Sequence, residues 1–148
     1  MALDIIIAEV AAILGAVPGI GRVHDYVRGL TTDQDFRDAC IDEQTKTLLA
    51  WMITREDTGS EQDGVHSTRD KHRIVIRGYM GVSDKVESEK AFQALIETIR
   101  ATFKQKRDLN GKVYWCEPVN LRGPVMGMFR GVLVHYCELV MIAEEYPA

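Results

Sequence analysis

The chain has few of the residues from which disulfide frameworks and zinc knuckles are built. Its 148 residues include only three cysteines, Cys40, Cys116 and Cys137, and no two of them form a C-x-x-C pair. Disulfide-stabilised domains and zinc modules need paired cysteines at short spacings. We therefore expect free thiols and a reducing compartment.

Long apolar runs and an excess of basic residues are also missing. No run approaches the roughly 18 residues that cross a bilayer, and Asp4 and Glu9 interrupt an apolar N-terminal stretch that lacks a basic start. The formal net charge is −4, whereas nucleic-acid-binding domains usually concentrate Lys and Arg. These absences argue against a secretion signal, a membrane span and specific nucleic-acid binding, and they favour a cytoplasmic protein.

What the chain does contain is the composition of one globular domain. Hydrophobic residues make up 46% and charged residues 27%, which excludes wholesale disorder. A chain of this length can bury roughly two-thirds of its unfolded surface. We expect residues 1–148 to form a single α+β domain.

Two segments have the apolar period of helices. Residues 4–15 carry a broad apolar stripe that ends at a glycine. Residues 85–107 repeat apolar side chains at helical spacing, and Asp84 with Glu87 has the spacing of a capping box. The polar stretch 31–44 surrounds a lone phenylalanine, and it predicts a loop or a marginal helical turn.

Four segments have strand character, and residues 23–27 allow a further short strand. Residues 47–54 and 129–144 are rich in apolar and β-branched side chains, residues 71–82 alternate with period two, and residues 113–119 follow a turn at Asn110-Gly111. Gly78 marks a bulge or a close backbone approach. The expected fold is a mostly antiparallel sheet of about four strands, packed by two main helices.

Two polar or glycine-containing stretches are expected to connect these strands. Residues 55–70 are too long and too polar for a tight hairpin turn, which predicts an exposed, mobile loop. Arg122-Gly123-Pro124 has the composition of another turn.

The last predicted strand carries one pair of residues with the chemistry of catalysis. His135 and Cys137 lie two apart and hence on one face, as a thiol nucleophile and its base would. A semi-buried strand that uses both residues as fillers has the same spacing, and the lack of a visible third group favours that structural role. With Glu138, they are the residues to suspect in an enzyme.

No cofactor or metal site is predicted from the remaining polar residues. The chain has four histidines at spacings that do not suit a metal site; they are His24, His66, His72 and His135. The loop acids Glu56, Asp57, Glu61 and Asp63 allow a general acid and base pair, a calcium loop or a solvated tip. The EF-hand order is absent, which favours the solvated tip.

The order of these segments resembles that of a known protein family. An apolar first helix is followed by TLLAWMITRED, a polar loop, HRIVIRGYMGV, EKAFQALIETIRATF and GVLVHYCELVMIAEE. This succession is similar to the tail terminator proteins of long-tailed bacteriophages. The resemblance spans nearly the whole chain and is one of element order and texture, so no catalytic or binding residue follows from it.

The resemblance implies a non-enzymatic structural protein of the virion. Such a protein forms a ring, usually hexameric, on the finished tail tube, stops its polymerisation and offers a surface for head-tail joining. The implied partners are further copies of the chain, the tail tube protein and the head-tail connector protein. DNA would pass through without specific binding, and assembly in the host bacterial cytoplasm would place the protein in the tail.

The acidic loop suggests one detail of that ring, and two alternatives stay open. Glu56, Asp57, Glu61 and Asp63 would face the lumen, where carboxylates repel phosphate. The first alternative is another head-tail neck or connector protein. The second is a small cytosolic enzyme or ligand-binding domain with a pocket between sheet and helices.

Overall fold

The described part of the chain folds into three α-helices and a six-stranded sheet. The computed structural model describes residues 2–30, 32–42 and 46–147. In chain order its elements are α1 (Ala2–Gly15), β1 (Arg22–His24), α2 (Asp33–Cys40), β2 (Leu49–Gln62), β3 (Thr68–Gly81), the short 3-10 helix η1 (Asp84–Val86), α3 (Ser88–Lys104), β4 (Trp115–Cys116), β5 (Asn120–Phe129) and β6 (Val132–Glu145). The expected α+β class is confirmed.

The strands lie in the order β1-β2-β3-β6, and β4 and β5 both pair with the outer side of β6. β1 runs parallel to β2, and all other pairs are antiparallel. The sheet is therefore mostly antiparallel, as expected, with more strands than the expected four or so. Beyond those four, the sheet contains β5 and the three-residue β1. The two-residue β4 lies within the predicted strand 113–119.

Helices α1 and α3 cover one face of the sheet and enclose the main core. Alternate residues of β2, β3 and β6 point into this core, as the period of two requires. Trp51 lies at its centre, with its ring centroid 5.7 Å from that of Phe92 and its Nε1 donating to the Ile20 carbonyl at 2.8 Å. A Cβ atom at Gly78 would overlap the Trp51 ring, so the close approach predicted at this glycine is confirmed.

Helix α2 covers part of the opposite face, where a loop or a marginal helical turn was expected. The Thr32 side chain accepts a hydrogen bond from the Asp35 amide at 3.0 Å and caps the helix. Phe36 is buried against Ala50 and Tyr79 in a second, smaller core. The helical alternative is thus confirmed. The helix is longer than one turn because Phe36, Ala39 and Cys40, spaced as i, i+3 and i+4, are all buried in this second core. Thr31 and residues 43–45 lie outside the described residues.

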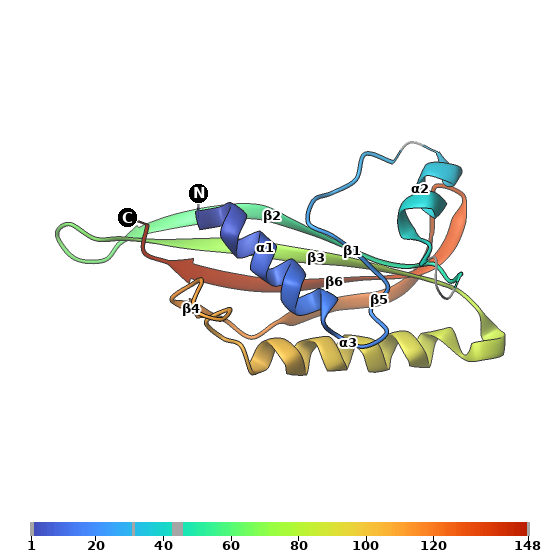
Figure 1. Ribbon diagram of the computed structural model, residues 1–148. Coiled ribbons are helices and arrows are strands. Elements are labelled where there is room, and N and C mark those ends of the chain that lie inside the picture. The colour runs from blue at the N-terminus through green and yellow to red at the C-terminus, as the bar shows by residue number, and fades with distance from the viewer. Residues whose placement is uncertain (1, 31, 43–45, 148) are drawn as a thin grey trace.

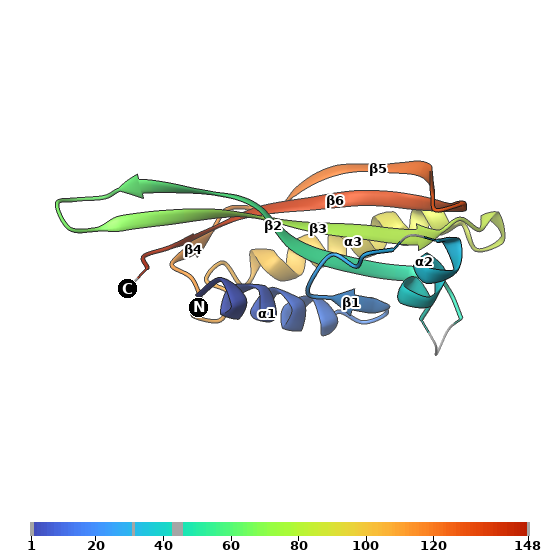
Figure 2. The same cartoon turned by 90° about the horizontal axis from the view of Figure 1, so that it is seen from above.

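The stretch 55–70 is a β-hairpin arm, and its prediction as a loop was wrong. β2 continues to Gln62 and β3 begins at Thr68, so residues 63–67 alone connect them. The predicted exposure is confirmed at residues 55–66, and mobility stays a prediction. The arm projects beyond the helices at the end where α1 begins and β6 ends (Figures 1 and 2). A β-bulge between Arg55 and Asp57 marks its base.

The C-terminal strands differ from the expected pattern at two turns. Arg122-Gly123-Pro124 lies inside β5 as an irregularity with a cis Gly-Pro bond, so the predicted turn there was wrong. The turn lies instead at Arg130-Gly131, where both residues have positive φ, and it divides the predicted strand 129–144. Helix α3 begins at Ser88 with no side-chain cap at Glu87, so the predicted capping box does not form.

Candidate functional site

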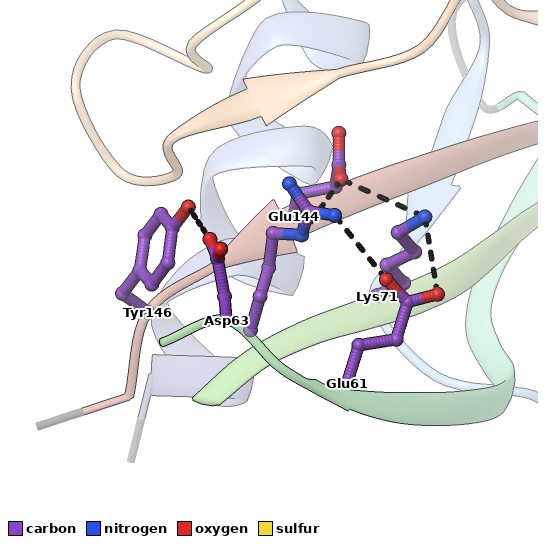
Figure 3. A network of polar contacts seen from close by, with 6 residues as sticks. Glu61, Asp63, Lys71, Glu144 and Tyr146 are labelled. Atoms are coloured by element: carbon purple, nitrogen blue, oxygen red, sulfur yellow. Dashed lines mark hydrogen bonds and ion pairs between the residues drawn. The ribbon is translucent and has the colours of Figure 1, made fainter. Parts of the chain in front are cut away.

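The carboxylate of Glu61 lies in a network of opposite charges on the hairpin arm (Figure 3). It accepts from Arg69 at 3.2 Å and forms an ion pair with Lys71 at 3.4 Å. Both cations also reach Glu144 on β6, at 3.4 and 3.9 Å. The hydrogen bond from Arg69, and then the charge of Lys71, hold the pKa of the Glu61 carboxyl below its ordinary value.

A second contact ties the arm to the chain that follows β6. The Tyr146 hydroxyl donates to the Asp63 carboxylate at 2.6 Å (Figure 3). This hydrogen bond raises the pKa of the Tyr146 hydroxyl, because ionised tyrosine has no proton to donate. The Tyr146 ring packs edge-on against Tyr114, with the ring centroids 5.3 Å apart.

The four predicted loop acids do not form one acidic surface. Asp57 pairs with Arg73 at 3.5 Å, and Glu61 and Asp63 have the partners described above. Glu56 is exposed in the bulge and has no polar partner among the described residues. Residues 55–73 contain four Lys or Arg and five Asp or Glu, a net charge of −1. Among the described residues, Asp57 and Glu61 are therefore paired with cations, whereas Asp63 accepts from a neutral hydroxyl.

The residues suspected of catalysis do not converge on one point. His135 and Cys137 share the face covered by the helices, as predicted, and Cys137 is fully buried. Burial raises the pKa of the Cys137 thiol to about 12, so the nucleophilic thiolate is disfavoured. Glu138 lies on the opposite face, with Arg77 at 3.5 Å and the Tyr136 hydroxyl at 2.9 Å.

His135 has a hydrogen-bond partner that the sequence pattern did not indicate. Its Nε2 lies 2.8 Å from the Ser88 hydroxyl oxygen, which also accepts from the Ser83 amide at 2.8 Å. The Ser88 proton is thus directed to His135, and both side chains are 4% exposed. Ser88 was missed because the helix start was expected earlier, at Asp84. The pair joins the start of α3 to β6, and among the described residues none forms a hydrogen bond with the other ring nitrogen.

An exposed apolar surface lies on the edge strand β5 and is here termed the β5 strip. Its members point to the same face of the sheet and are Met126, Met128 and, on the adjacent β6, Leu133. Their exposure ranges from 43% to 64%. Within the described chain, β5 has a strand on one side only, so its outer backbone groups are free to pair. Unprotected apolar edge strands favour association with another chain. The sequence did not predict this edge because Gly123-Pro124 masked the strand.

A cavity of about 440 Å³ lies between α3 and the segment 116–119. Its walls include Val119, Met141 and the basic side chains of Arg100, Lys104 and Arg107. Arg100 donates to the Val119 carbonyl at 3.2 Å, and Arg107 donates to the Cys116 carbonyl at 2.6 Å. The volume lies within the usual range for a small-molecule site.

Comparison with known proteins assigns no family to this chain. Among the described helices, none is long and apolar enough to cross a membrane. No protein-family model matches the sequence, and no curated protein matches it either.

Proposed function

We propose that the protein is a structural component of a bacteriophage tail, forming a ring of about six copies. The ring closes the tail tube, stops its polymerisation and provides a surface for head-tail joining. The resemblance in element order supports this assignment. The structural observation that carries it is a sheet with two different free edges, one on each side.

The two edges favour contact between unlike surfaces of neighbouring copies. β1 pairs with β2 only over Ala50–Met52, so the outer side of β2 from Ile53 to Gln62 has no strand beside it within the described residues. The opposite edge is β5. Contact between two unlike edges is head-to-tail, and head-to-tail contact closes into a ring when the rotation per copy allows.

The β5 strip supplies a reason for that contact to form. Burial of apolar surface contributes roughly 25 cal/mol per Å², and three exposed apolar side chains, Met126, Met128 and Leu133, lie on one face here. Natural edge strands are usually protected by charges, prolines or bulges. In β5 the charge and the bulge are confined to Arg122–Val125, which leaves Met126–Phe129 unprotected.

The geometry around Cys137 and the hairpin arm is consistent with a structural role. The Cys137 thiol is buried, and Glu138 lies on the opposite face of the sheet. The residues suspected from the sequence therefore do not form one catalytic group. A lumen position for Glu56, Asp57, Glu61 and Asp63 remains part of the proposal. Since residues 55–73, which include Lys71 and Arg73, together have a net charge of −1, we expect weak rather than strong repulsion of DNA there.

The assembly is tested with a charged substitution in the strip. Purified protein is examined by negative-stain electron microscopy and light scattering over a concentration series, alone and with tail tube protein. We expect rings for the wild type and for Val65→Asp, which changes an exposed valine in the connection between β2 and β3. Met128→Asp should remain monomeric. Equal assembly by Met128→Asp, or no wild-type ring even with tail tube protein, would contradict the proposal.

Two other functions have specific support. If the chain is instead a neck protein, it would use the same two edges. It would then bind the head-tail connector protein but not the tail tube protein. A ligand-binding protein would use the cavity beside α3, whose basic lining suits an anion. A thermal-shift screen of small anions tests that function, with Lys104→Glu expected to remove any stabilisation by the ligand.

A further inference from the structure

Three side chains with metal-binding atoms meet at the base of the hairpin arm. Asp70 and His72 lie two residues apart on β3 and therefore point to the same face. Asp70 is the direct cross-strand partner of Glu145 on β6. One ligand atom from each of the three residues lies within 4.8 Å of the other two. The rigid strand pairing brings these atoms together.

The charges of this cluster are not balanced by nearby Lys or Arg side chains. Among the described residues, none forms an ion pair with Asp70, and Glu145 pairs with His72 alone, at 2.8 Å. Arg69 and Lys71 alternate with Asp70 and His72 along β3, so they face the opposite side of the sheet. There they form ion pairs with Glu61 and Glu144. Two carboxylates so close repel each other unless a cation lies between them.

The surroundings of His72 have the arrangement that supports metal binding. Its Nδ1 lies 2.8 Å from the Thr58 hydroxyl oxygen, and its Nε2 faces Glu145. A metal-binding histidine usually donates its second N–H to an oxygen, which fixes the ring and directs the free lone pair to the ion. Ser60 likewise donates to Asp70, at 2.6 Å. Without a metal ion, the Nε2–H group donates a hydrogen bond directly to the Glu145 carboxylate.

We propose that Asp70, His72 and Glu145 bind one divalent transition-metal ion, for which zinc is the best match. Imidazole selects zinc-like metals over magnesium and calcium, and the carboxylates supply charge neutralisation. In a tetrahedral site with bonds of about 2.0–2.1 Å, ligand atoms lie about 3.3 Å apart. In the present structure these atoms lie within 4.8 Å of one another. Rotation of the two carboxylates brings them to the shorter distance, and the Asp70 side chain is partly exposed. Three protein ligands leave one position for water.

The bound ion would join β3 to β6 where the arm leaves the helix-covered part of the sheet. Binding moves the His72 proton from Nε2 to Nδ1 and turns Thr58 from donor to acceptor. The arm is thereby held in one direction relative to β6. This role does not depend on the proposed tail function.

The full chain is first treated with a chelator to remove bound metal. Zinc binding is then measured by isothermal titration calorimetry, and thermal denaturation is compared with and without zinc. The wild type should bind one zinc ion per chain and denature at a higher temperature with zinc. His72→Ala and Asp70→Asn should each weaken binding more than tenfold. His66→Ala, which changes an exposed histidine in the connection between β2 and β3, should bind like the wild type. Thr58→Val should weaken binding about 10- to 100-fold.

A second readout keeps the test decisive if His72→Ala does not fold. Cobalt(II) in a tetrahedral site gives a characteristic visible spectrum, which we expect for the wild type and not for the near-isosteric Asp70→Asn. Absence of one-to-one binding, or equal binding by wild type and Asp70→Asn, would overturn the proposal. Loss of binding in His66→Ala would instead identify adventitious binding at exposed histidines.

Discussion

The two halves of β2 are stabilised in different ways. Its first five residues are buried, and its last eight are exposed. The buried half packs Trp51 between the sheet and α3, whereas the exposed half is paired with β3 and held by ion pairs such as Glu61–Arg69. Because exposed ion pairs contribute only about 0–1 kcal/mol each, the arm depends on the rest of the sheet, while the core stabilises itself.

The largest expected effect comes from removing the centre of the core. Trp51→Ala should lower the free energy of unfolding by about 3–5 kcal/mol, because it leaves a cavity beside Phe92 and an unpaired Ile20 carbonyl. Urea denaturation followed by circular dichroism measures the change. The matched control is Trp115→Ala, where the ring is partly exposed and stacks on Arg107, with an expected loss of about 1 kcal/mol or less. Equal losses would contradict this account of the core.

A smaller effect is expected for a buried hydrogen bond within the helix-covered half. Ser88→Ala leaves the Ser83 amide and His135 Nε2 without their partner, and we expect a loss of about 1–3 kcal/mol in unfolding free energy. Thr98→Ala on the exposed side of α3 should change it by less than about 0.5 kcal/mol. If Ser88→Ala matched Thr98→Ala, burial would not be what distinguishes these contacts.

The smallest effect is expected on the arm and is best measured locally. The pKa of Glu61 is lowered in the folded chain, so its stabilisation is present above the unfolded-state pKa. It is lost as pH falls through the lowered folded-state value. Carbon-13 NMR titration should give a midpoint below the ordinary glutamate value, which Arg69→Gln shifts upward. Arg55→Gln should leave it unchanged, since no ion pair joins Arg55 to Glu61; an unshifted wild-type midpoint would count against the network.

The sequence predicted the helix-covered half of the fold better than the arm. Apolar periodicity placed α1, α3 and β3, since each has one face against the main core. Beyond Ile53 that signal ends, and the bulge at Glu56 shifts the alternation: Arg55 and Thr58 both pair with residues on the helix-covered face of β3. A strand prediction based on period-two alternation therefore fails across the bulge at Glu56.

The candidate sites depended on contacts that no local pattern contains. His135 and Cys137 were correctly placed on one face, because that follows from their spacing. His72 and Glu145 are 73 positions apart in sequence and meet only through the pairing of β3 with β6. Met128 belongs to an exposed strip only because β5 has a neighbour on one side. Pairing between distant strands, rather than composition, decided these positions.

The bulge at the base of the arm has a consequence for changes in chain length. Glu56 is the extra residue between Arg55–Ile74 and Asp57–Arg73, so its deletion would leave every cross-strand pair of the arm intact. Deletion of one residue between Thr58 and Gln62 would instead turn the following side chains to the opposite face. Since a bulge bends its strand and increases the local twist, Glu56 determines where the tip of the arm points. The arm could thus be redirected by the loss of one residue without any change in its partners.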